Sequence, residues 1–158
     1  MRFGEYDISE VFQIEKSALY HSLGKGISTV EFVLYKANSE LLLIEAKFNS
    51  PRPAKQMDFN DFIDEIYAKF AHSVQVFFAV VLSRLRDSNN DMPNTFKTID
   101  YADVAIKLLL VIRGHREEWL LPIPDALRKR LRRECRIWKL QLAVINDEIA
   151  VEQKLIKQ

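Results

Sequence analysis

Residues 28–48 read STVEFVLYKANSELLLIEAKF, two apolar and β-branched runs separated by a short interruption. The first run, Ser28–Tyr35, and the second, Glu40–Phe48, each have the length and composition typical of a β-strand. The small and polar residues between them, Ala37-Asn38-Ser39, are typical of a turn. The segment therefore predicts a β-hairpin.

Charged residues interrupt both predicted strands. Because side chains alternate across a strand, Glu45 and Lys47 share one face of the second strand, while Leu42, Ile44, Ala46 and Phe48 share the other. A three-residue loop at Ala37-Asn38-Ser39 places Glu31 opposite Glu45 and Thr29 opposite Lys47. A two-residue loop would shift the register by one residue and move Glu31 to the opposite face.

Two opposed carboxylates repel each other unless a cation or a proton joins them. Oxygen-rich sites select hard ions such as Mg²⁺ or Mn²⁺, which polarise phosphate groups and lower the pKa of bound water. A neighbouring lysine stabilises the charge of the transition state. Glu31 and Glu45 are therefore predicted metal ligands, and Lys47 a predicted catalytic residue for phosphodiester hydrolysis. The alternative is a solvated hairpin face with Glu–Lys pairs across the strands.

The rest of the chain predicts further helices and strands. Before the hairpin we expect a helix over Ile8–Leu23, capped by Asp7 or Ser9 and ended near Gly24 and Gly26. Pro51 and Pro53 end the second strand of the hairpin. After it we expect a long amphipathic helix from Asp58 to about Arg86. A polar loop over 87–100 is followed by a strand over Ala105–Arg113, a helix capped by Asp125 and running through Arg133, a strand over Ile137–Ile145 and a terminal helix over Asp147–Lys157. This order predicts one α/β domain over residues 1–158, with a central mixed sheet flanked by helices.

A third acid lies on the first predicted helix. Glu15 falls in the middle of its apolar stripe, whereas Glu10 falls on the opposite side. A carboxylate on a core-facing stripe needs a partner. Glu15 is therefore the predicted third acid of the site and Glu10 the weaker substitute, the alternative being a helix residue bridged to a surface lysine. Lys69 and Gln75 on the long helix could approach the site, but the sequence does not place them.

A helix with an acid, a strand with an acid, a strand with hydrophobic-Glu-X-Lys, a long helix and a further strand follow one another over residues 8–113. The two motifs are Val30-Glu31-Phe32-Val33-Leu34-Tyr35 and Leu43-Ile44-Glu45-Ala46-Lys47. This order resembles the PD-(D/E)XK nuclease superfamily, whose fold is restriction-endonuclease-like. The resemblance implies an αβββαβ-type core with C-terminal helical and strand additions, in which Glu31 and Glu45 bind the metal and Lys47 serves catalysis. Glu31 stands where the family usually has Asp, and Val30 where Pro is common.

The expected function is thus a Mg²⁺- or Mn²⁺-dependent nuclease acting on DNA, with RNA as a further substrate and with Glu15, Glu31, Glu45 and Lys47 as catalytic residues. The first alternative is a non-catalytic subunit with a nuclease fold, which binds or assembles within a nucleic-acid-processing or defence complex. A homodimer or another protein partner fits that alternative. The second is an effector-binding domain unrelated to nucleases, which would be favoured if the two hairpin strands were not adjacent.

Basic residues gather in a second cluster: Arg128, Lys129, Arg130, Arg132, Arg133 and Arg136. The net charge is only +1, so a nucleic-acid surface has to be a local patch. Arginine pairs with phosphate through two hydrogen bonds, which makes Arg128, Arg130, Arg132 and Arg133 predicted nucleic-acid contacts. The alternative is a solvated helix face. We expect Trp119 to fill a core or an interface, and His115, after Gly114, to be an ordinary surface histidine.

Cys135 is the only cysteine, which excludes an intramolecular disulfide and a cysteine-based zinc site. The chain shows no secretory segment and no apolar run of about 18 residues. These features predict a soluble cytoplasmic protein without a membrane partner.

Overall fold

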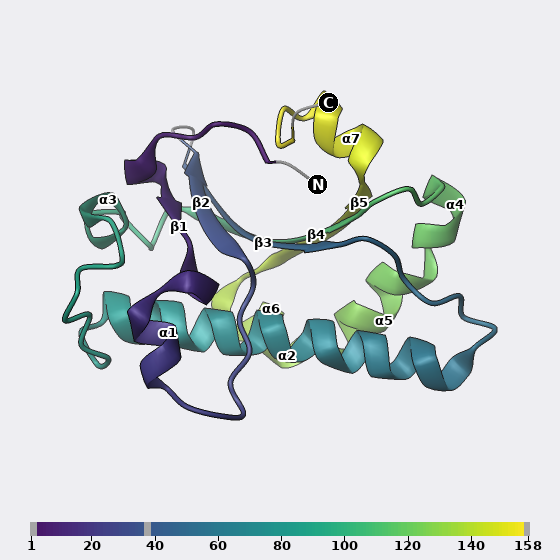
Figure 1. Ribbon diagram of the computed structural model, residues 1–158, viewed down its shortest axis with the longest axis horizontal. Coiled ribbons are helices and arrows are strands. Elements are labelled where there is room, and N and C mark those ends of the chain that lie inside the picture. The colour runs from purple at the N-terminus through teal and green to yellow at the C-terminus, as the bar shows by residue number, and fades with distance from the viewer. Residues whose placement is uncertain (1–2, 37–38, 157–158) are drawn as a thin grey trace.

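The computed structural model describes residues 3–36 and 39–156 and contains a five-stranded mixed sheet (Figure 1). The strands are β1 (Val11–Phe12), β2 (Phe32–Lys36), β3 (Glu40–Lys47), β4 (Ala105–Ile112) and β5 (Gln141–Asn146), and they lie in this order across the sheet. The pairs β1–β2 and β2–β3 are antiparallel, whereas β3–β4 and β4–β5 are parallel. The predicted α/β class with a mixed sheet is confirmed.

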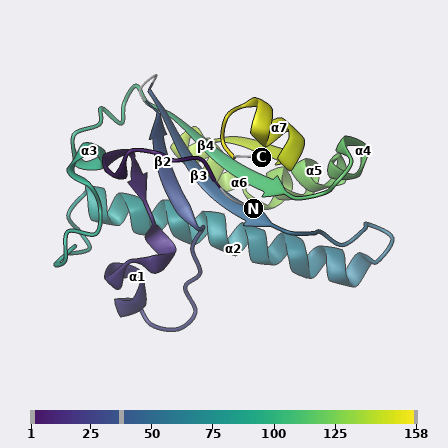
Figure 2. The same cartoon turned by 45° about the horizontal axis from the view of Figure 1, so that its top comes forward.

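Helices cover both faces of this sheet. They are α1 (Ala18–Ser22), α2 (Gln56–Val81), α3 (Asn94–Lys97), α4 (Glu117–Leu120), α5 (Pro122–Arg130), α6 (Arg132–Trp138) and α7 (Asp147–Glu152), with two 3₁₀ turns, η1 (Ile8–Glu10) and η2 (Ile14–Lys16). Helix α2 runs across one face, and α7 with the N-terminal segment lies on the other (Figures 1 and 2). No helix in the described ranges combines the length and the apolar character needed to cross a membrane.

The register of the hairpin is the predicted one. Phe32 pairs with Ile44, Val33 with Leu43, and the ladder ends at Lys36 and Glu40. Ala37 and Asn38, on which the predicted turn depends, lie outside the described residues. Ser39 has a φ of 69°, in the left-handed region that tight turns use. Because β2 and β3 are adjacent, the condition that would have favoured an unrelated effector-binding domain is not met.

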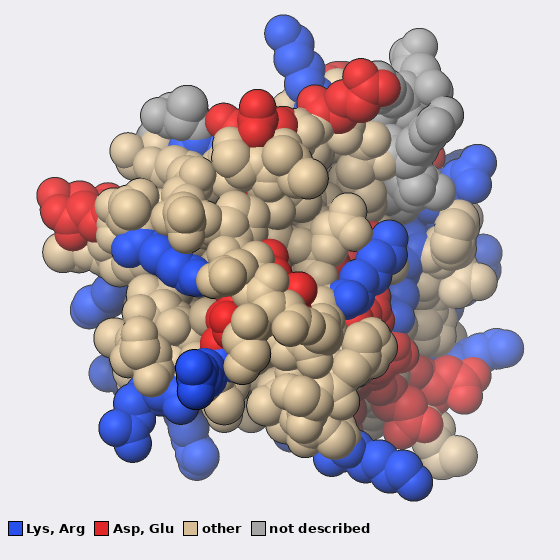
Figure 3. All heavy atoms as spheres, turned by 60° about the vertical axis from the view of Figure 1, so that its left-hand side comes forward, with Lys and Arg blue, Asp and Glu red and all other residues tan. Residues whose placement is uncertain are grey.

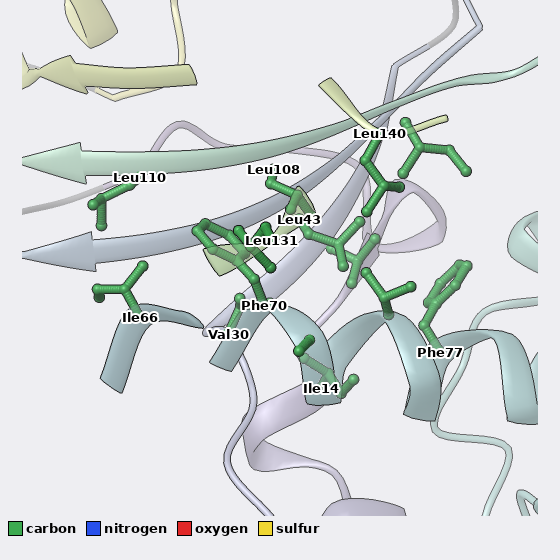
Figure 4. Close-up of a cluster of buried hydrophobic side chains, with 14 of the residues drawn as sticks. Ile14, Val30, Leu43, Ile66, Phe70, Phe77, Leu108, Leu110, Leu131 and Leu140 are labelled. Atoms are coloured by element: carbon green, nitrogen blue, oxygen red, sulfur yellow. The ribbon is translucent and has the colours of Figure 1, made fainter. Parts of the chain in front are cut away.

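Strand β3 is central and apolar on both faces, which is why it is buried on both. Leu41 and Leu43 belong to the core beneath α2, and Leu42 and Ile44 to the core on the opposite face. Figure 4 shows Phe70 of α2 beside Leu43 in the first of these cores. Alternation along β3 therefore sends the next two residues of the first set, Glu45 and Lys47, toward α2.

The predicted N-terminal helix over Ile8–Leu23 is wrong. The segment breaks into η1, β1, η2 and α1, because Val11 and Phe12 extend the sheet by pairing with Leu34 and Val33. The side chain of Asp7 caps η1 by accepting a hydrogen bond from the Ser9 N–H. The Ser17 hydroxyl caps α1 in the same way.

The C-terminal boundaries also differ from those predicted. Asp125 is not an N-cap but lies in the first turn of α5, which begins at Pro122. Ile137 lies in α6 rather than in a strand, and α6 ends because Lys139 adopts a left-handed φ of 54°. The terminal helix ends at Glu152, and the predicted end at Lys157 lies outside the described residues.

Two other segments follow the prediction in part. The long helix is confirmed over Gln56–Val81 but ends before Arg86. The polar segment 87–100 contains the short helix α3 and buries Met92 and Phe96, whose side chains fill the core beside α2.

Phe77→Ala tests the core beneath α2. Phe77 is fully buried, with its ring centroid 6.0 Å from those of Phe96 and Tyr101. Removing the ring leaves a cavity, so we expect the free energy of unfolding to fall by about 3–5 kcal/mol in urea titrations. Phe48→Ala is the matched control: Phe48 is 69% exposed, and its replacement should change stability by no more than about 0.5 kcal/mol. Equal losses in the two variants would contradict this core.

Candidate active site

A buried carboxylate lies at the centre of the candidate site. Glu45 is near the end of β3, on the face that α2 covers, and is only 1% exposed. Burial raises the pKa of this carboxyl, while the neighbouring cations Lys69 and Lys47 act in the opposite direction. A buried carboxylate is costly unless it is paired, and these two cations offset part of that cost.

Lys69 of α2 is the closer of the two cations. Its Nζ lies 3.0 Å from Glu45 Oε1 and 3.6 Å from Glu15 Oε1, and it donates a hydrogen bond of 3.2 Å to the Thr29 carbonyl. An ammonium group has three donors, and three oxygens surround it here. Lys69 therefore joins α2 to β3, to η2 and to the segment that leads into β2.

Glu15 reaches the site by a different route from the one predicted. It lies in η2 rather than on a helix stripe, and its side chain is 43% exposed. Ile8, the first residue of the predicted helix, is 88% exposed. Glu15 does pair with a lysine, as in the alternative to a site role, but this lysine is the largely buried Lys69 of α2.

Glu31 lies one residue before β2, not within it. Phe32 and Ile44 form the last pair of the ladder at this end, so the next residue outward on each strand is Glu31 on one side and Glu45 on the other. Burial raises the pKa of Glu31, and the charges of Glu45 and Glu15 raise it further, against the opposing charge of Lys69. The predicted electrostatic coupling of Glu31 and Glu45 is thus present in the structure.

Lys47 stands at the outer side of Glu45. Its Nζ is 3.4 Å from Glu45 Oε1 and donates a hydrogen bond of 2.5 Å to Glu65 Oε1 on α2. Burial acts to lower the pKa of Lys47, but the hydrogen bond to Glu65 and the charges of Glu45 and Glu65 outweigh it and raise the pKa. Lys47 is therefore a firmly protonated cation at neutral pH.

The oxygen atoms around Glu45 bear on metal binding. Within the described ranges, no group of three or more His, Cys, Asp or Glu side chains is arranged to hold a metal ion. Two buried oxygens, Glu45 Oε2 and Thr29 Oγ1, have no hydrogen-bond partner in that part of the chain. Mg²⁺ keeps several waters and needs only one or two carboxylates from a protein. Glu31 and Glu45 are carboxylates of the kind that such an ion binds, and Glu45 Oε2 is a buried oxygen that has no partner among the described residues.

A hollow of about 870 Å³ adjoins the acids from the N-terminal side. Its lining includes Glu15, Glu31, Phe32, Gln13 and Lys16. Figure 3 shows acidic side chains among neutral ones near the middle of one face of the molecule, with lysine and arginine side chains around them. Two of the candidate acids thus face space that a ligand can enter.

The predicted arginine cluster lies on α5 and α6, and its side chains are exposed. Arg128 is 3.2 Å from Asp125 of its own helix. Arg130 pairs with Asp64 of α2 and also lies over the Tyr67 ring, 5.4 Å from the centroid. These two arginines are thus engaged within the chain, whereas Arg132 and Arg133 form no ion pair in the part of the chain that the structure describes.

The structure adds Glu65 to the predicted residues and places Lys69, which the sequence named without a position, beside Glu45. Both lie on α2, four residues apart and therefore on one helix face. They flank Ile66, which is fully buried in the core beneath the sheet. A Glu-x-x-x-Lys pair beside a core-facing residue is the sequence signal that could have placed them.

No protein-family model matches this sequence, and no curated protein or solved structure is significantly similar to it. The functional argument therefore depends on the geometry and chemistry of the residues themselves.

Glu45→Gln tests the buried carboxyl through pH. Because burial raises its pKa above the ordinary 4.5, the folded state binds this proton more tightly than the unfolded chain does. The resulting stabilisation is present below about pH 4.5 and is lost as the pH rises through the raised pKa. In metal-free buffer, the free energy of unfolding of the wild type relative to Glu45→Gln should therefore fall from acidic to neutral pH.

Denaturant titrations at a series of pH values measure this difference. Glu40→Gln is the matched control, because Glu40 lies on the same strand and pairs with Lys107 at 3.4 Å. A wild-type advantage over Glu45→Gln that grew from acidic to neutral pH would contradict the assigned direction of the pKa shift.

Proposed function

We propose that this protein is a metal-dependent nuclease that hydrolyses phosphodiester bonds, with DNA as the first substrate to test and RNA as the second. The observation that carries the proposal is the buried Glu45, which keeps one unsatisfied carboxylate oxygen beside Glu31 and a protonated Lys47. Acids and a cation meeting at the end of a buried strand suit phosphate chemistry better than they suit packing.

Each residue has a distinct role in this proposal. Glu31 and Glu45 would hold Mg²⁺ or Mn²⁺, which would supply polarisation of the phosphate and a lowered pKa of a bound water. Lys47 holds its positive charge beside the phosphate and stabilises the negative charge that develops there. Without metal, Lys69 pairs with both Glu45 and Glu15 and offsets one of their two charges, and Glu15 positions Lys69.

The order of elements supports the resemblance to the PD-(D/E)XK superfamily. Three strands, the long helix α2 and then β4 follow one another, with the acid Glu31 entering β2 and the Glu45-Ala46-Lys47 motif ending β3. Two features depart from the expected αβββαβ core. The short helix α1 lies between β1 and β2 instead of before β1, and Glu31 precedes its strand.

One observation favours the alternative of a non-catalytic subunit that binds or assembles with nucleic-acid-processing partners. Lys69 already bridges Glu45 and Glu15, and Lys47 is bonded to Glu65, so two cations offset part of the charge of these three acids without a metal. Such a network stabilises α2 on the sheet whether or not the site is catalytic. The nuclease requires a bound metal and Lys47 for cleavage, whereas the non-catalytic subunit requires neither.

Lys47→Ala tests catalysis. Glu45 keeps Lys69 at 3.0 Å in this variant, so the fold should survive. We expect Mg²⁺-dependent cleavage of labelled single-stranded and duplex DNA and RNA to fall by roughly 10²–10³-fold, the loss typical of removing one electrostatic stabiliser. Lys107→Ala, which removes another strand lysine paired with a glutamate, should cleave like the wild type. Equal rates in Lys47→Ala and the wild type would assign the cleavage to another site or to a contaminant.

Metal linkage tests the ligands directly. Millimolar Mg²⁺ or Mn²⁺ should raise the melting temperature of the wild type, because an ion that binds only the folded state stabilises it. The double variant Glu31→Gln/Glu45→Gln should lose this rise, and Glu40→Gln should keep it. A wild-type melting curve that does not respond to either ion would argue for the non-catalytic alternative.

A further inference from the structure

Three arginines and two aromatic rings gather where β3 and β4 end, at the right of Figure 1. We refer to them as the arginine–aromatic rim: Phe48, Arg52, Arg113, Arg116 and Trp119. The guanidinium carbons of Arg52 and Arg116 lie 4.8 and 5.5 Å from the centroid of the Trp119 ring, and that of Arg113 lies 6.0 Å from the Phe48 ring. Segments far apart in sequence therefore build one surface.

The rim adjoins the proposed site along the backbone. The Arg113 N–H donates a hydrogen bond of 2.9 Å to the Lys47 carbonyl, extending the parallel pairing of β3 and β4. Phe48 follows Lys47 directly in the chain. The backbone of the rim thus begins one residue from Lys47, while strand alternation places the Phe48 side chain on the opposite side of the sheet from Lys47.

The rings of the rim are left open to solvent. Phe48 is 69% exposed and Trp119 is 39% exposed, and all three arginines are exposed. Of the two places expected for Trp119, a core or an interface, its exposure excludes the core, whereas its neighbour Leu120 is buried. Exposed large rings surrounded by cations mark a binding surface more often than a stabilising one.

His115 holds the tryptophan in place. Its ring meets that of Trp119 edge to face at 5.9 Å, and its Nε2 is 2.9 Å from Ser50 Oγ. The Asn146 side chain donates a hydrogen bond to the His115 carbonyl. Trp119 therefore packs against a histidine that is held by two other segments, through Ser50 and Asn146. The acid Glu118 is 3.7 Å from Arg116, and both are more than half exposed, so this pair is weak.

We propose that the arginine–aromatic rim binds single-stranded nucleic acid, with bases stacked on Trp119 and Phe48 and phosphates bound by the three arginines. This proposal deepens the nuclease proposal, on which its connection to Lys47 rests, by naming an unpaired strand as the substrate class. Only unpaired bases present a free face to a protein ring, whereas a duplex presents phosphates and groove edges. An exposed cation–π contact is weaker than the stacking of a base, so a base displaces Arg52 or Arg116 from Trp119.

The test measures affinity separately from cleavage. A fluorescein-labelled oligothymidylate is titrated with the protein in EDTA, and the intrinsic tryptophan fluorescence is followed in parallel. The wild type should bind the single strand more tightly than a duplex of the same length, and its tryptophan emission should be quenched. Trp119→Ala should bind the single strand about tenfold more weakly, and Trp119→Phe should keep most of the affinity because it retains a ring.

The arginines are tested against matched pairs. Arg113→Ala/Arg116→Ala should lower the log–log salt slope by about 0.7 for each phosphate that the variant no longer binds, whereas Arg84→Ala/Arg86→Ala, beyond the far end of α2, should leave it unchanged. Arg132→Ala/Arg133→Ala measures what the predicted α5–α6 patch contributes. Thermal melting confirms that each variant is folded.

Three results would overturn the proposal: wild-type affinity in folded Trp119→Ala, tighter binding of the duplex than of the single strand, or full competition by polyglutamate, which would identify an acidic protein as the ligand. The two proposals fail separately. If binding depends on Trp119 but cleavage does not depend on Lys47, the rim proposal stands and the nuclease proposal fails. If cleavage depends on Lys47 but binding does not depend on Trp119, the nuclease proposal stands and the rim proposal fails.

Discussion

A carboxylate buried in the middle of a protein has to be compensated, and in this fold the compensation of Glu45 holds several elements together. The strand that carries it is central and buried on both faces, so water cannot hydrate the carboxylate. Lys69 of α2 and Lys47 of the same strand provide positive charge beside it instead. Because Lys69 also binds Glu15 and the Thr29 carbonyl, one ammonium group positions α2, η2 and the entrance to β2 relative to β3.

The parallel pairing of β3 and β4 has a second consequence. Parallel strands end at the same edge of a sheet, and in open α/β sheets that edge is where ligands bind. Here Lys47 pairs with Ile112, and the next residue along β4, Arg113, bonds back to the Lys47 carbonyl. Lys47 of the candidate site and Arg113 of the arginine–aromatic rim are therefore neighbours along the backbone because of strand direction, although more than sixty positions separate them in the chain.

The same network supports both a structural and a catalytic role, and the physical difference between them is small. Through Oε1, Glu45 forms an ion pair with Lys69 that fastens α2 to the sheet. With a divalent ion, the same carboxylate would use the oxygen that now lacks a partner. Replacing a buried ion pair with apolar residues is often neutral or stabilising, so packing alone does not require Glu45, Lys69 and Glu15 to be charged. Because the fold does not require these charged side chains, their presence favours a binding or catalytic role for the site.

The sequence by itself determined the local geometry. Alternation along β3 was enough to put Glu45 and Lys47 on one face, and apolar patterns predicted α2 and β4, because each pattern lies within one segment of the chain. The β2–β3 register followed from the sequence only for a three-residue loop. Only the tertiary structure decided what those faces meet. Val11 and Phe12 became a strand because β2 offered an open edge, overriding their helical periodicity. Lys69 reached Glu45, and Trp119 reached Arg52, because packing brought distant segments together, and no local pattern encodes such a meeting.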